Sequence, residues 1–301
     1  MSELAWGPIL AGYLFLGGMA GGAFIVAALA DLFKGEDYEV VSKSGTYVSL
    51  ISIIVGLVLL ILDLKRFEVA PLVILNAYRR FPDSILTVGT WIITGFTVIS
   101  LLTSVLWLFN GNKLVRKLLD IVGFVLGIST AAYTGLLLSF SRGAPFWNTS
   151  LLPWTFVVSG TLTGLAVALL MIPVIAIFMP RPFKEFETLF KDKVRFSNLM
   201  GYGQRYIVVL ILIELVLVII EMGLGGHMGA LLSEFGLSLA FYGYLVLGLL
   251  VPLGISYFLG KMKAGRNDTS ILLFSTGGFV LILVGGFLLR YVVLTAGQII
   301  H

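Results

Sequence analysis

The sequence predicts an all-α membrane protein with about eight transmembrane helices in one membrane domain, residues 1–301. Its mean hydropathy is +1.05, and 58% of its residues are apolar while only 12% are charged. That charged fraction is about half of what a soluble domain carries. Backbone polar groups in lipid must be paired within helices or in a closed barrel. The apolar runs are about 20 residues long and lack the strict alternation of barrel strands, so we expect helices.

Eight apolar runs are expected to cross the membrane, at residues 8–30, 46–64, 85–109, 118–140, 154–179, 206–226, 236–260 and 271–297. The residues before the first run include no Lys or Arg, so we expect this run to remain as a helix and not to be a removable signal. Small residues at a spacing of four let helices approach closely in membranes. In the first run, Gly17 with Gly21 and Gly18 with Gly22 have this spacing and predict close packing. Gly277, Gly278, Gly285 and Gly286 are expected to act similarly in the eighth run.

The basic residues outside the spans predict the orientation, because cytoplasmic loops are enriched in Lys and Arg. Five lie on the side of the termini: Lys65, Arg66, Arg79, Arg80 and Arg142. Fourteen lie on the opposite side: Lys34, Lys43, Lys113, Arg116, Lys117, Arg181, Lys184, Lys191, Lys193, Arg195, Arg205, Lys261, Lys263 and Arg266. Both termini are therefore expected outside the cytoplasm, and the net charge of +4 reflects orientation and not a nucleic-acid partner.

Most of the outer basic residues fall in the connection of residues 65–84. We interpret Arg66, Tyr78, Arg79 and Arg80 as a docking surface for a partner protein. A solvated loop that rests on lipid headgroups is the alternative interpretation.

Four ionisable residues lie inside the predicted spans, where each costs about 2.5–3.5 kcal/mol unless it has a partner or a function. Helix direction places Asp63 at the outer end of the second span, Glu214 near the midplane, and Glu221 two turns further out on the same face. Arg290 is expected about 10 Å inside the outer end of the eighth span. A structural ion pair between Glu221 and Arg290 is an alternative to a functional role. Asp120 is interpreted as a charge near the first turn of its helix.

Aromatic residues occupy the same outer layer. An interfacial belt would explain Trp6 and Tyr291, but Tyr13, Trp91 and Tyr133 lie deeper. Hydroxyl donors, an arginine and carboxylates around a hollow open to lipid suit a quinone. Its carbonyl groups need hydrogen bonds and protons, and its tail needs an apolar route.

The sequence has no cysteine and two histidines, His227 in an outer loop and His301 at the last position. We therefore expect no haem, no Cys-ligated iron–sulfur cluster and no thiolate zinc site. Electrons would have to be exchanged with cofactors of another subunit.

Most of the sequence resembles the NrfD-like membrane subunits, a family that includes polysulfide reductase. The resemblance is carried by YLFLGGMAGGAF, DLKRF, SILTVGTWI, Tyr133-Thr134-Gly135, PFWNTSLLPWTFVVSG and GGFLLRYVVLTAGQ, in this order. Asp63, Leu64 and Arg66 match the family pattern Asp-Leu-Gly-Arg-Pro, whereas Lys65 and Phe67 depart from it. Ser84, Gly89 and Trp91 match the next motif.

The resemblance implies two four-helix bundles, residues 8–140 and 154–297, with both termini outside a prokaryotic cytoplasmic membrane. It also implies a quinone site near the outer surface, with menaquinone as the expected type. The implied partners are a ferredoxin-like iron–sulfur subunit and a molybdopterin or other catalytic subunit, as in anaerobic respiration. In polysulfide reductase a histidine of the first helix contacts the quinone head. Tyr13 stands at that place, and Tyr133 matches a tyrosine of the fourth helix.

We therefore expect the membrane subunit of a respiratory oxidoreductase, which exchanges electrons and protons between a quinone and an iron–sulfur partner and leaves the terminal chemistry to another subunit. Whether protons are also translocated stays open. Tyr13, Tyr133 and Trp91 are expected to bind the quinone, Asp63, Glu221 and Arg290 to set charge and protons, and Glu214 to begin a proton path toward the cytoplasm. The alternatives are a secondary transporter with a site between two helical halves, and a structural anchor whose charges are all paired.

Overall fold

The computed structural model describes residues 6–34, 38–63, 76, 78–79, 81, 84–140, 145–179, 183–225, 228–261 and 268–299. Within these ranges the protein forms helices and no strand, and eight helices are long and apolar enough to cross a membrane. The predicted all-α class and the number of spans are confirmed.

The eight spans are, in sequence order, α1 (Pro8–Phe33), α2 (Glu39–Asp63), α4 (Ile85–Leu108), α5 (Lys113–Ser139), α6 (Leu152–Phe178), α8 (Lys193–Gly225), a continuous helix made of α10 (Phe235–Gly243), η3 (Tyr244–Leu250) and α11 (Val251–Lys261), and α12 (Asp268–Ile299). Three shorter helices are η2 (Pro145–Trp147), α7 (Lys184–Lys191) and α9 (Met228–Ser233). The largest difference from the prediction is that α8 begins at Lys193 and not near residue 206. Hydropathy marks only the part of a helix that lies in lipid, whereas helical hydrogen bonding continues through the polar residues beyond it.

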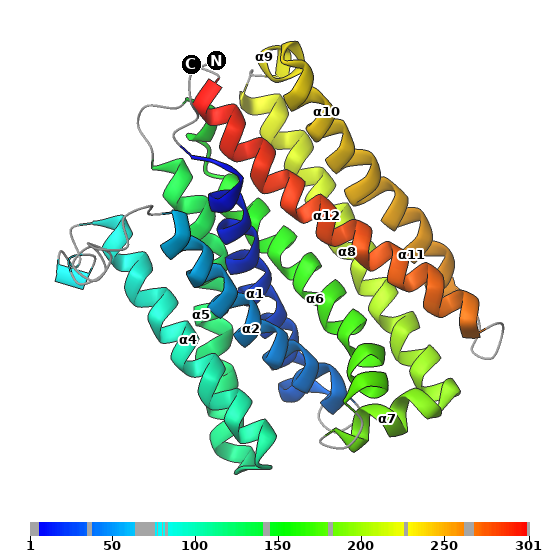
Figure 1. Ribbon diagram of the computed structural model, residues 1–301. Coiled ribbons are helices and arrows are strands. Elements are labelled where there is room, and N and C mark those ends of the chain that lie inside the picture. Colours follow the sequence, from blue (N-terminus) through cyan, green and yellow to red (C-terminus); the bar gives the residue numbers. More distant parts are fainter. Residues whose placement is uncertain are drawn as a thin grey trace.

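The two termini lie at the same end of the helical bundle, which we call the terminal end (Figure 1). The opposite end carries α7, and we call it the α7 end. Helices α1 and α6 lie in the middle: α1 packs along α2, α5 and α6, and α6 also contacts α8 and α12. Helix α4 lies on one edge and α10–α11 on the other (Figure 1). Contacts of α6 with α1, α2 and α5, and of α12 with α1, therefore join the first four spans to the last four.

Glycines make the central helix crossings possible. A Cβ atom on Gly22 would lie 1.9 Å from the carbonyl oxygen of Gly160 in α6, and one on Gly21 would lie 2.4 Å from the carbonyl oxygen of Gly127 in α5. In α12, a Cβ on Gly285 would lie 2.3 Å from Cα of Gly248. The close helix packing predicted for the first span is confirmed at Gly21 and Gly22, whereas Gly18 faces the side chain of Arg290 and Gly17 makes only ordinary contact. In the eighth span it holds at Gly285 and Gly286, whereas Gly277 faces open space and Gly278 makes only ordinary contact.

Helix α7 is an amphipathic helix that the hydropathy pattern did not indicate, because only eight residues form it. Its Phe186 is fully buried, and Glu185 accepts a hydrogen bond of 2.6 Å from Nζ of Lys43 in α2. An apolar anchor and an ion pair thus fasten the connection between α6 and α8 to the first half of the protein.

At the terminal end, Trp6 makes specific contacts that an interfacial aromatic belt does not require. Its ring stacks on Trp147 at 5.4 Å, and its backbone exchanges hydrogen bonds of 2.9 and 3.0 Å with the side chain of Gln298. Trp147 in turn donates from Nε1 to the carbonyl oxygen of Val293 at 2.7 Å. These contacts hold the segment before α1 and the helix η2 against α12.

Candidate functional site

Arg290 of α12 lies at the centre of the second half of the bundle and is fully buried. Its Nη1 donates to Oγ of Ser159 at 2.6 Å and to the carbonyl oxygen of Gly286 at 3.1 Å. Its Nη2 donates to the carbonyl oxygen of Phe156 at 3.3 Å. Gly18 of α1 leaves the space for this group, since a Cβ there would lie 2.9 Å from Nη2. The guanidinium is therefore held by α6 and α12 and closed in by α1.

Glu214 of α8 is the counterpart of this arginine. It is 1% exposed, and its Oε1 accepts a hydrogen bond of 2.9 Å from the hydroxyl of Tyr244. Glu214 and Arg290 attract each other electrostatically, although no direct ion pair joins these two described residues. Oε2 of Glu214 and Nε of Arg290 are buried without a hydrogen-bond partner among the described residues. A proton or a water molecule in this place would be bound between groups of opposite charge.

Tyr244 was not predicted as a site residue from the sequence. It is the first residue of η3, a turn of π-helix inside the seventh span. Such turns are rare and are frequent at functional sites. Tyr244 could have been predicted because it is a tyrosine in the middle of an apolar run, and the same feature led to the prediction of Tyr13 and Tyr133 in other spans.

Glu221 of α8 lies nearer the terminal end. Its two carboxylate oxygens accept hydrogen bonds from Thr149 at 2.8 Å and from Thr155 at 3.3 Å. The expected alternative, an ion pair with Arg290, is not formed between these two described residues. Glu221 borders a cavity of about 50 Å³ together with Phe241 and Val292. That space is sufficient for one or a few water molecules.

A second, larger cavity of about 500 Å³ lies beside the first, between α5 and α6. Thr149 lines both cavities. The hydroxyl group of Thr149 thus connects the carboxyl group of Glu221 to the larger cavity. That cavity has the size of small-ligand sites, about 300–1,000 Å³.

Tyr13 of α1 and Tyr133 of α5 are brought together, as expected. They are 4% and 5% exposed and close enough to interact electrostatically. The ring of Tyr133 packs on Gly89 of α4, where a Cβ would lie 1.8 Å from the ring carbon that carries the hydroxyl. The ring of Tyr13 lies near Gly56 of α2. The pair is therefore closely packed inside the first half, apart from Glu214, Glu221 and Arg290.

Trp91 and Asp63 lie away from both groups. Trp91 is 51% exposed on the outside of α4, and its ring contacts the ring of Tyr78 at 5.2 Å. Asp63 is the last residue of α2 and half-buried. Of the predicted docking surface, Tyr78 shares a hydrogen bond of 2.7 Å with Thr94 and Arg79 is exposed. Arg66 and Arg80, like His227 and His301, lie outside the described residues.

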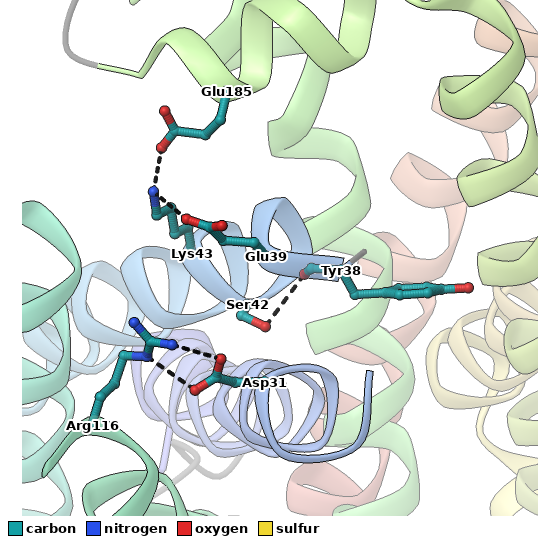
Figure 2. A network of polar contacts seen from close by, with 7 residues as sticks. All are labelled: Asp31, Tyr38, Glu39, Ser42, Lys43, Arg116 and Glu185. Carbon is teal, nitrogen blue, oxygen red and sulfur yellow. Dashed lines mark hydrogen bonds and ion pairs between the residues drawn. The ribbon is translucent and has the colours of Figure 1, made fainter. Parts of the chain in front are cut away.

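The α7 end contains a charged network that the sequence analysis treated as loop charges (Figure 2). Arg116 of α5 binds both carboxylate oxygens of Asp31 in α1, at 2.9 and 3.0 Å, and its guanidinium lies 3.6 Å from the ring centre of Trp107. Lys43 of α2 binds Glu39 at 2.8 Å and Glu185 at 2.6 Å. The first pair of groups joins α5 to α1, and the second joins α2 to α7.

The interpretation of Asp120 as a charge near the first turn of its helix was wrong. Helix α5 begins at Lys113, and Asp120 lies two turns inside it, 1% exposed. Its Oδ2 is buried without a hydrogen-bond partner in the described part of the protein. The prediction failed because the apolar run starts later than the helix.

The described residues hold no cluster of three His, Cys, Asp or Glu side chains that could bind a metal ion. The polar groups at the terminal half are instead hydroxyls, carboxylates and one guanidinium, which can bind and transfer protons. They form two separate sets: the tyrosine pair of the first half, and the Arg290, Glu214 and Glu221 set of the second.

Known proteins resemble this protein along its whole length. Residues 1–301 match the family model for polysulphide reductase, NrfD. The C subunit of polysulfide reductase from Wolinella succinogenes is 32% identical over 190 aligned positions, with 56% of the present sequence and 58% of that subunit covered. The NrfD homolog of Haemophilus influenzae is 28% identical over 335 aligned positions, with 99% of the present sequence and 95% of that protein covered. The Hdr-like menaquinol oxidoreductase integral membrane subunit of Archaeoglobus fulgidus is 25% identical over 169 residues, 56% of the present sequence and 42% of that protein. With eight apolar helices and a match over its full length, the chain is a multi-pass integral membrane protein of the polysulphide reductase NrfD family.

Proposed function

We propose that this protein is the membrane subunit of a respiratory oxidoreductase complex, which exchanges electrons and protons between a membrane quinone and an iron–sulfur partner subunit. The observation that carries the proposal is the set of buried proton-binding groups in the second half: Glu214 with Tyr244 and Arg290, and Glu221 with Thr149. Ionisable groups at this depth are costly and mark pathways for ions or protons. One relative is named a menaquinol oxidoreductase subunit, which makes menaquinone the first quinone to test.

Protons and electrons would leave the quinone by different routes. The sequence has no cysteine, so an iron–sulfur cofactor that accepts the electrons would be bound by the partner. Protons would move along side chains of the membrane subunit. Glu214 is the candidate for a path toward the α7 end, since the next buried polar pair in that direction is Gln204 with Ser275 at 3.1 Å. Gln204 lies ten residues, about 15 Å, further along α8.

The partner is proposed to dock at the terminal end, near the exposed Arg79. A catalytic subunit that carries the terminal chemistry, a molybdopterin protein among the candidates, would bind to the iron–sulfur subunit. The membrane would be the cytoplasmic membrane of a prokaryote, with the terminal end outside.

The test is purification of the tagged protein from its native membrane in a mild detergent, followed by iron, sulfide and quinone analysis. We expect an iron–sulfur protein and a quinone to co-purify, and added menaquinol to reduce the iron–sulfur centres. Arg79→Glu should release the partner, whereas Arg195→Glu, a charge change at the α7 end, should not. A protein that purifies alone and transports a solute in vesicles would overturn the proposal in favour of a secondary transporter.

A further inference from the structure

The cavity of about 500 Å³ between α5 and α6 is large enough for a small membrane-soluble molecule. Its apolar wall consists of Ile128, Ala132 and Leu136, which follow one another at a spacing of four along α5, and of Trp154 in α6. Leu136 is 36% exposed and Trp154 is 59% exposed, although both belong to membrane-spanning helices. The groove is therefore open to the lipid.

The polar groups of this groove lie at its end toward the termini. They belong to Ser139 of α5 and to Asn148, Thr149 and Ser150 of the connection to α6, and the apolar rings of Phe140 and Pro153 complete the lining. From Ile128 to Ser139 the groove extends about 17 Å, roughly half the thickness of the hydrocarbon layer. Its described lining offers hydroxyl and amide groups and no charged side chain. This lining suits a neutral ring with hydrogen-bonding substituents better than a phosphate headgroup, which would require basic partners.

Thr149 connects this groove to an acid. Its hydroxyl donates to Oε1 of Glu221 at 2.8 Å, so its oxygen can still accept a hydrogen bond from a ligand in the groove. Glu221 in turn borders the small cavity that extends toward Phe241 and Leu289. A proton that enters at Thr149 therefore has a carboxyl group and a space for water behind it.

We propose that the groove between α5 and α6 binds the ring of an isoprenoid quinone or quinol, and that Thr149 relays the ring protons to Glu221. The inference rests on the proposed function and names its site. In quinol oxidation, two electrons pass one at a time to the iron–sulfur partner. Each of the two O–H bonds breaks as the proton moves to Oγ1 of Thr149 while the proton of Thr149 moves to Glu221. Glu221 releases the first proton before it takes the second. Quinone reduction is the same sequence reversed.

The site differs from the tyrosine pair, although both involve α5. Ala132 lines the groove, while the neighbouring Tyr133 packs on Gly89 inside the first half. Variants at adjacent positions can therefore separate the two locations.

The experiment uses the purified complex, a photoreactive azido-menaquinone and mass spectrometry of the labelled peptides. Ala132→Phe should fill the groove, lower labelling of α5 and α6, and raise the KM for menaquinol by about tenfold or more. Thr149→Val should keep the labelling and lower kcat by about 100-fold, the scale of a lost acid–base relay. Val125→Phe, on the lipid-exposed side of the same helix and outside the groove, is the matched control and should change neither.

Two results would overturn the inference. One is labelling of peptides around Tyr13 and Tyr133, with turnover sensitive to Tyr133→Phe and Asp63→Asn but not to Ala132→Phe. The other is groove labelling that an excess of ordinary phospholipid displaces as well as menaquinone does, which would show a lipid-binding groove. If the wild-type complex shows no menaquinol-linked turnover, the proposed function fails, while the labelling of Ala132→Phe still decides whether the ring binds in the groove.

Discussion

Arg290 shows why single charged residues in this protein are informative. An arginine offers five N–H donors, and here three hydrogen bonds and the attraction of Glu214 replace the water it has lost. The arrangement depends on residues that are not charged: Ser159 supplies an acceptor, and Gly18 supplies space. Removal of one charge of such a pair leaves the other buried without compensation.

Arg290→Met should therefore destabilise the protein by about 3–5 kcal/mol, because it removes the buried charge that faces Glu214 and leaves the hydroxyl of Ser159 and two backbone carbonyl oxygens without their hydrogen-bond donor. The double variant Arg290→Met with Glu214→Gln should recover part of this loss. The measurement is thermal unfolding in detergent for the wild type, both single variants and the double variant. Arg79→Met, which changes an exposed arginine, is the control. Strictly additive effects of the two single changes would show that the two groups do not interact.

Helix crossings are the next level of organisation, and α1 against α6 is the closest of them. The stretches GGMAGG (17–22) and SGTLTG (159–164) meet there: a Cβ on Gly22 would collide with Gly160, and a Cβ on Gly164 would lie 2.2 Å from the backbone nitrogen of Ala23. Lipid provides no hydrophobic force that would push helices together, so such contacts rest on close backbone packing. The glycines of α1 are thus structural, and they also create the space in which Arg290 lies.

Gly22→Ala should separate α1 from α6 and cost about 1–3 kcal/mol of stability, since the methyl group would meet backbone and not a flexible side chain. Gly277→Ala in α12 is the matched control, because nothing lies within 4 Å of its Cβ position. A lower unfolding temperature only in Gly22→Ala is the expected result. Equal unfolding temperatures in both variants would contradict the role of this crossing.

The whole molecule has two chemically different ends. The α7 end is fastened by the ion pairs of Asp31 with Arg116 and of Lys43 with Glu39 and Glu185. The terminal end is fastened by stacked tryptophans and hydrogen bonds to the backbone, and both cavities that Thr149 lines lie toward it. The excess of basic residues at the α7 end predicts that this end faces the cytoplasm.

The absence of cysteine from the sequence makes this orientation simple to test. Phe235→Cys places a single thiol at the terminal end, where Phe235 is 81% exposed, and Lys191→Cys places one on α7. A membrane-impermeant maleimide applied to intact cells should label Phe235→Cys and leave Lys191→Cys unlabelled until the cells are opened. The reverse labelling pattern would mean that the terminal end, with Glu221 and the proposed quinone groove, faces the cytoplasm.

The sequence by itself determined the fold class, the eight spans, the glycine-mediated packing of the first helix and the family. These follow from local properties of the sequence: apolar length, residue spacing and motif order. The high cost of a charge in lipid also made Glu214, Glu221 and Arg290 recognisable from their positions alone.

Only the tertiary structure decided which of these groups meet. Residues far apart in sequence become neighbours through helix packing, and spacing does not reveal which face of a helix meets which partner. For this reason Tyr244 and Thr149 were missed, and Trp91 was expected beside Tyr13 and Tyr133, from which it points away. Asp120 was placed too near the start of its helix because α5 begins before the apolar run does. The groove between α5 and α6 likewise exists only because these two helices leave space between them, and that is a property of their packing and not of either sequence segment.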